Sequence, residues 1–149
     1  MYQNILVPID GSDTATSGLL EAIKLARAGG GRLRLVNIYS TAVIALEYAA
    51  AYTALDDVPN KLRAAGEVLL KQAEDLVRQH EVQFDTVLLG TAIDNIGELI
   101  VSQAKQLPAD LIVMGTHGRR GLVRLVMGST AEYVLRHSPV PMLLVRKQT

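Results

Sequence analysis

Short unbroken apolar runs alternate along the chain with amphipathic stretches. Apolar residues that recur every three or four positions predict helices, whereas short continuous runs of Val, Ile and Leu predict strands buried on both faces. This pattern predicts five strands, at residues 5–9, 33–39, 82–89, 111–114 and 140–145. It predicts four helices between them, from residue 12 or 13 to the glycines at 29–31, from after Pro59 to residue 77, from 96 to before Pro108, and at 129–136.

The strict alternation of strand and helix predicts an α/β fold. A helix between consecutive strands makes a crossover, and right-handed crossovers give a parallel sheet covered on both faces. No internal repeat or linker is visible, so we expect a single domain over residues 1–149. Residues 40–58 fit either a helical excursion or a flap that closes over a ligand. In such sheets ligands bind beyond the carboxyl ends of the strands, which directs attention to the loops that follow them.

Composition narrows the class of protein. Of 149 residues, 49% are hydrophobic and the net charge is zero, which excludes intrinsic disorder. A sequence pI near 6.8 argues against nucleic acid as a partner. No stretch approaches the roughly 20 apolar residues that span a bilayer, and the start lacks a secretory pattern. We therefore expect a cytoplasmic protein with no membrane insertion; the lack of cysteine is compatible with that compartment.

Positive charge is concentrated in the last quarter of the chain. From Gly115 onward there are six basic residues and one acidic residue, Glu132. A local basic region in a neutral protein suits a compact anionic ligand. A solvated helix face would explain the same charges.

Glycines and hydroxyl residues after the fourth strand form the strongest motif, Gly115-Thr116-His117-Gly118 followed by Gly128-Ser129-Thr130. Glycine lets backbone N–H groups approach an anion closely, and a helix N-terminus favours phosphate. Arginine side chains could clamp phosphate oxygens; the candidates are Arg119, Arg120 and Arg124. The bland alternative is that Gly128 and Ser129 simply cap a helix, since Ser129-x-x-Glu132 has capping-box spacing.

These residues resemble the universal stress protein family. The spacing Gly115-x2-Gly118-x9-Gly128-Ser129 is similar to its nucleotide signature, and residues 5–12 and 137–145 also resemble the family. The resemblance covers essentially the whole chain, more weakly over 40–60. It implies a Rossmann-like (adenine nucleotide alpha hydrolase-like) five-stranded parallel sheet in the order 3-2-1-4-5, with helices on both faces. It also implies membership of the ATP-binding branch and a homodimer.

The same resemblance implies roles for individual residues. Nucleoside contacts would come from Pro8, Asp10, Ile38, Met114 and Gly115. Phosphate contacts would come from Gly118, Gly128, Ser129 and Thr130, with His117, Arg119 and Arg120 as additional candidates. From the residues alone, Asp10 could instead form an Asx turn, and His117 could be an ordinary loop residue. No protein metal site is expected; Mg²⁺ would arrive with the nucleotide.

The function expected is regulation by nucleotide binding rather than catalysis. The chain has no Gly-Lys of a Walker motif, no dinucleotide fingerprint and no nucleophile elbow. The alternatives are slow ATP hydrolysis or autophosphorylation in the same pocket, and a structural member that binds AMP or nothing. The last strand is apolar and is expected at a sheet edge, where it could pair with a second copy or simply pack within the monomer. The resemblance implies a homodimer through this edge, on which tetramers could build. Family members that regulate membrane solute transporters, including TRAP-type osmolyte importers, make such a client compatible with this chain.

Overall fold

The computed structural model describes residues 1–42, 57–117 and 127–147. These residues form a five-stranded parallel sheet in the order β3-β2-β1-β4-β5, which confirms the expected fold class and strand order. The strands are β1 (Asn4–Pro8), β2 (Arg32–Ser40), β3 (Phe84–Thr91), β4 (Leu111–Gly115) and β5 (Met142–Val145). The helices are α1 (Asp13–Gly29), α3 (Val58–Gln79), α4 (Ile96–Gln106) and α5 (Ser129–His137).

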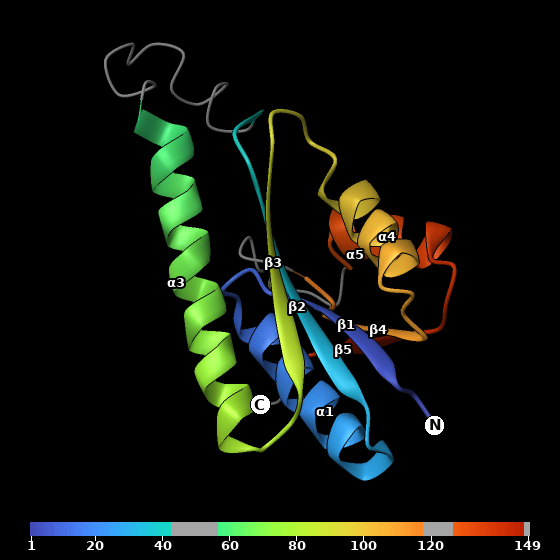
Figure 1. Ribbon diagram of the computed structural model, residues 1–149. Helices are drawn as coiled ribbons and strands as arrows, with labels where there is room; N and C mark the ends of the chain where they lie inside the picture. Colours follow the sequence, from blue (N-terminus) through green and yellow to red (C-terminus); the bar gives the residue numbers. More distant parts are fainter. Residues whose placement is uncertain (43–56, 118–126, 148–149) are drawn as a thin grey trace.

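The helices cover both faces of the sheet, as expected. Helices α1 and α3 lie on one face, and α4 and α5 on the other (Figure 1). Each face has its own apolar core: one packs Ile5, Val7 and Leu35 against α1 and α3, and the other packs Leu6, Val36 and Ile112 against α4 and α5. Neighbouring residues of a strand therefore enter different cores, which explains why the strands read as continuous apolar runs.

Helix α1 begins and ends where the sequence indicates. Ser12 is its N-cap, and the Ser12 side chain accepts a hydrogen bond from the Ala15 N–H at 3.1 Å. Gly30 ends it in the left-handed conformation with φ +69°, and its N–H bonds to the Ala26 carbonyl. Both ends thus satisfy backbone groups that a helix terminus leaves unpaired.

Two strands start two residues later than the sequence-based expectation, whereas the bounds of the other three agree with it to within one residue. Strand β3 runs from Phe84 to Thr91 rather than 82–89, because Glu81 turns the chain with φ +57° and Val82 is buried without joining the ladder. Strand β5 starts at Met142 rather than 140, since Ser138 and Val140 form a side-chain turn and Pro141 has no N–H to donate. Helix α3 starts one residue before Pro59, which occupies its first turn.

Strand β5 lies at one edge of the sheet, as expected for the last strand. Its Leu143 side chain is 37% exposed. The expectations for residues 43–56 of the excursion lie outside the described residues, and the division into a single domain stays a prediction. Among the described helices, none has the length and hydropathy needed to cross a bilayer.

Candidate functional site

The carboxyl ends of β1 and β4 lie side by side at the centre of the sheet. The two strands pair directly, with Ile5 opposite Leu111 and Leu6 opposite Ile112. Winding direction reverses between them, because β2 follows β1 on one side while β4 lies on the other. This switch point is where ligands bind in open parallel sheets. The sequence-predicted site residues that the structure describes lie in three places: at or beyond the ends of β1 and β4, on β2, and at the start of α5. They are Pro8, Asp10, Ile38, Met114, Gly115, His117, Gly128, Ser129 and Thr130.

Four candidates lie outside the described residues. These are Gly118, Arg119, Arg120 and Arg124, which belong to the segment between β4 and α5. Their roles stay predictions.

The loop after β1 is shaped by Asp10. Its Oδ1 accepts hydrogen bonds from the Ser12 N–H at 2.8 Å and from the Ser12 hydroxyl at 2.5 Å. This is the Asx turn considered as the alternative for Asp10. Within the described residues only Oδ1 is engaged, so the turn leaves the other carboxylate oxygen, Oδ2, available. The turn and a ligand contact are therefore compatible.

The loop after β4 meets the start of α5 at close range. The Gly128 N–H donates to the Thr116 carbonyl at 2.7 Å. A Cβ placed on Gly128 would lie 3.3 Å from the His117 Cα, so a larger branched side chain would push the two segments apart. The His117 ring is held locally, with its Nδ1 3.1 Å from the Thr116 hydroxyl. The close approach thus leaves little room for a side chain at position 128.

Helix α5 begins without a side-chain cap. Its N-cap is Gly128, and the first helical bond runs from the Glu132 N–H to the Gly128 carbonyl at 2.9 Å. Within the described residues, the N–H groups of Ser129, Thr130 and Ala131 have no acceptor. Gly128 caps the helix, as the alternative interpretation allowed. The capping box itself does not form, because Ser129 is the first helical residue and the Glu132 carboxylate pairs with Arg136 at 2.8 Å. Uncapped donors at a helix N-terminus suit an anion.

Helix α1 packs against β4 at backbone distance. A Cβ on Gly115 would lie 2.7 Å from the Thr14 Cβ, and one on Gly18 would lie 3.5 Å from the Met114 carbonyl carbon. The Thr14 side chain, only 2% exposed, occupies this contact and donates its hydroxyl proton to the His117 carbonyl. We refer to this contact of Thr14 and Gly18 with the end of β4 as the α1–β4 seam.

Sequence reasoning missed Thr14 and Asn37. Asn37 lies on β2 with 5% exposure, and its Nδ2 donates to the Ile9 carbonyl at 2.8 Å. It thereby holds the residue just before Asp10. A polar residue inside the apolar run 33–38 is a signal that could have revealed it. Its Oδ1 has no partner within the described residues and faces Gly66 of α3, where a Cβ would lie 2.5 Å away.

A charge pair flanks the first turn of α1. The Lys147 ammonium lies 2.7 Å from the Asp13 carboxylate, and this hydrogen bond and charge lower the pKa of Asp13 and raise the pKa of Lys147. Both side chains are exposed, so the pair is screened by solvent. Among the described residues, no three His, Asp or Glu side chains gather into a metal site. A cation here would have to be held largely by a ligand's own oxygens and water.

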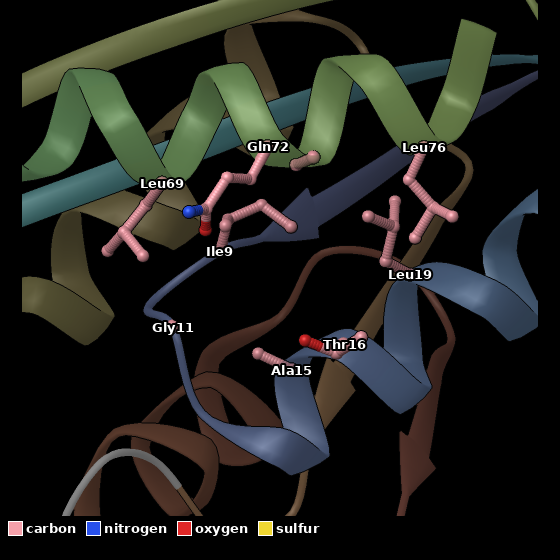
Figure 2. Close-up of a pocket in the computed structure, with 9 residues that line it drawn as sticks. Ile9, Gly11, Ala15, Thr16, Leu19, Leu69, Gln72 and Leu76 are labelled. Carbon is pink, nitrogen blue, oxygen red and sulfur yellow. The ribbon is translucent and has the colours of Figure 1, made fainter. Parts of the chain in front are cut away.

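A groove of about 240 Å³ lies between α1 and α3 and also contacts the loop after β1 (Figure 2). Leu69, Gln72 and Leu76 point from α3 toward α1. The lining is otherwise apolar or small and comes from Ile9, Gly11, Ala15, Thr16, Leu19 and Ala73. None of the predicted site residues lines this groove. It is therefore separate from the strand-end corner, although it shares the β1 loop.

The fold and the position of its strand-end corner define a Rossmann-like α/β protein with a candidate site at the switch point. A family model described as the universal stress protein family matches residues 1–146. The chain therefore belongs to the universal stress protein family, as the sequence motifs indicate.

Curated relatives match along nearly the full chain. Universal stress protein MJ0531 of Methanocaldococcus jannaschii is 29% identical over 99% of this chain and 84% of its own length. YxiE of Bacillus subtilis, also a universal stress protein, is 28% identical over 98% of this chain and 100% of its own length.

Solved structures share the fold. Universal stress protein UspA from Lactobacillus plantarum aligns with a TM-score of 0.81 at 28% identity, over 97% of this chain and 98% of that one. A universal stress protein from Archaeoglobus fulgidus was solved with dAMP; it aligns with a TM-score of 0.67 at 23% identity, over 97% and 98%. Another universal stress protein was solved with cAMP; it aligns with a TM-score of 0.66 at 22% identity, over 99% and 98%.

Proposed function

We propose that this universal stress protein binds ATP at the strand-end corner and acts as a nucleotide-dependent regulatory module in a stress response. The observation that carries the proposal is the uncapped start of α5, where three N–H donors stand beside the loop after β4. The helix dipole adds partial positive charge at this end, and a phosphate group is a compact anion that satisfies several donors at once.

The proposed ligand is an adenine nucleotide. The solved relatives with dAMP and cAMP carry adenine and phosphate, which supports this class of ligand for a chain of the same family. Phosphates would be held by Gly128, Ser129 and Thr130, together with Gly118, Arg119, Arg120 and His117. Mg²⁺ would travel with ATP on the phosphate oxygens, because hard cations prefer oxygen ligands.

The nucleoside would lie toward β1 and β2. Asp10 would accept a ribose hydroxyl through Oδ2, since Oδ1 is engaged by Ser12. Pro8 and Met114 would contact the apolar faces of the nucleoside, with Gly115 beside it. The main chain of Ile38 would read the adenine edge.

Equilibrium dialysis with ATP tests the site. The double variant Gly128→Val, Ser129→Ala should abolish measurable binding, because the valine branches collide with the Thr116–His117 segment and one hydroxyl donor is lost. Ser102→Ala on α4 is the control and should bind ATP like the unchanged protein. Equal ATP affinity in the double variant and the unchanged protein would reject the site.

We also propose that two chains assemble through β5. An exposed edge strand offers unpaired backbone groups to a second copy, and Leu143 adds exposed apolar surface. Leu143→Lys should convert dimer to monomer in sedimentation experiments, and tetramers, if they build on dimers, should vanish with it. Val68→Lys on α3, where Val68 is 56% exposed, is the control and should leave assembly unchanged.

We further propose that the protein is located in the cytoplasm. We also propose that its client is a membrane solute transporter of the TRAP type. Nucleotide binding would alter the hold of the module on its client. Pull-down of the transporter by this protein with and without ATP tests the idea. If the amount of transporter captured changes neither with ATP nor with the Gly128→Val, Ser129→Ala double variant, the result counts against it.

The second candidate function is slow ATP hydrolysis or autophosphorylation. The hydroxyls of Ser129 and Thr130 favour it, because both stand at the proposed phosphate end. Single-turnover incubation with γ-labelled ATP separates the two functions. Binding alone should give neither released phosphate nor labelled protein above the protein-free blank.

A further inference from the structure

The first turn of α1 holds two loops that are remote in sequence. Ser12 donates its hydroxyl proton to Asp10 and so holds the loop after β1. Thr14, two residues later, donates its hydroxyl proton to the His117 carbonyl and so holds the loop after β4. Because both residues belong to one helical turn, the turn fixes the position of one loop relative to the other.

The count of hydroxyl protons shows that these two contacts are separate. Each hydroxyl carries one proton, and both protons are already engaged, by Asp10 and by His117. The 3.3 Å approach of the Ser12 and Thr14 oxygens is therefore a packing contact between neighbours and not a donor–acceptor pair. Removal of the Thr14 hydroxyl should release the His117 loop and leave the Asp10 turn intact.

The α1–β4 seam makes the Thr14 contact stiff. Thr14 is 2% exposed, and Gly115 leaves no room between it and the end of β4. Anchoring the His117 carbonyl sets the direction in which the chain leaves β4. The same loop accepts the Gly128 N–H through Thr116, so the anchor extends to the start of α5.

We propose that Thr14 is a positioning residue that sets the phosphate half of the nucleotide site relative to its nucleoside half. This inference rests on the proposed function. Thr14 would not touch the ligand; its hydroxyl would align the β4 loop with the N-terminus of α5, so that triphosphate and nucleoside are bound together. Loss of the hydroxyl should therefore weaken ligands in proportion to the phosphates they carry.

The experiment compares ATP with adenosine by isothermal titration calorimetry. Thr14→Val removes the hydroxyl while nearly keeping the shape, and it should lower ATP affinity about three- to tenfold, the effect of one buried hydrogen bond. Adenosine affinity should change less than twofold. Thr14→Ser keeps the hydroxyl and should restore ATP binding. Thr16→Val is the matched control. Thr16 lies two residues further along α1, and its hydroxyl donates to the Ser12 carbonyl at 3.3 Å. This variant should bind ATP and adenosine like the unchanged protein.

The outcomes are distinguishable. An unchanged protein that binds no ATP overturns the proposed function, and this inference with it. An unchanged protein that binds ATP while folded Thr14→Val binds it equally well overturns this inference alone. Equal losses for ATP and adenosine would show a general structural role and also overturn it. Thr14→Ala deletes the same hydroxyl without a bulky replacement and takes the place of Thr14→Val if the valine does not fold beside Gly115.

Discussion

The two sides of α1 are packed in opposite ways. Toward β4, the seam brings Thr14 and Gly18 to backbone distance from the strand and adds a buried hydrogen bond to His117. Toward α3, long side chains such as Leu69 leave a groove of about 240 Å³ (Figure 2). One helix therefore has a close-packed side at the candidate site and a loosely packed side away from it.

The difference indicates a division of labour. Backbone-to-backbone contact leaves no rotamer to adjust, so it transmits position accurately, whereas contact through leucine side chains can repack. Changes at the tight Thr14–Gly115 contact of the seam should alter both stability and ligand binding. Changes in the groove should alter stability alone.

The largest effect is expected on the groove side, from Leu19→Ala. Leu19 is 2% exposed, lines the groove and packs in the core, so its truncation should lower the free energy of unfolding by about 3 kcal/mol. Urea denaturation measures this loss, and ATP affinity of the folded variant should stay within twofold. Gln72→Leu at the groove rim is the control, with a change within about 0.5 kcal/mol. A strong loss of ATP binding in folded Leu19→Ala would contradict the division.

A smaller stability loss with a larger effect on the site is expected from Gly115→Ala. The new methyl would lie 2.7 Å from the Thr14 Cβ, and such overpacking costs about 2 kcal/mol. ATP affinity should fall with it, because the His117 anchor must shift. Gly18→Ala provides the matched control: its methyl meets Met114 at an ordinary 3.5 Å, so stability should stay within about 1 kcal/mol. Equal changes of stability and ATP affinity in Gly115→Ala and Gly18→Ala would contradict the expected difference between a 2.7 Å and a 3.5 Å contact.

The smallest effect is expected outside both sides of α1, at the Arg34–Asp85 pair between β2 and β3. The hydrogen bond from Arg34 at 2.9 Å lowers the pKa of Asp85. A lowered pKa means that the folded state favours the carboxylate, so the contribution is present at neutral pH and disappears as pH falls through the lowered pKa. Asp85→Asn should cost about 0.5 kcal/mol at pH 7 and nothing at low pH, in unfolding curves measured against the unchanged protein. If the difference in free energy of unfolding between Asp85→Asn and the unchanged protein grows as the pH falls, the lowered pKa of Asp85 is contradicted.

The architecture could be predicted because its signals are local. Each strand is an apolar run and each helix an amphipathic stretch, and the crossovers then dictate a parallel sheet. The misplaced boundaries have a common cause: Val82 and Val140 are apolar residues that stand next to a strand without joining its ladder. Periodicity reports burial, and burial does not require strand pairing.

The candidate site was less accessible to sequence reasoning. The glycine motifs point to the corner because glycine spacing is local information. The roles of Thr14 and Asn37 depend on partners in other segments, His117 and Ile9, which no periodicity reports. The capping-box spacing at Ser129 was misleading because Arg136, one turn further along α5, takes the Glu132 carboxylate.

The hydrogen bond from Thr14 to His117 joins residues 103 positions apart. A chain emerging from the ribosome completes α1 long before it synthesises the carbonyl that Thr14 holds, so the corner cannot assemble until most of the polypeptide has been made. Long-range closure of this kind is slow compared with local helix formation. Any ligand that needs the corner intact would therefore bind only after this long-range contact has formed.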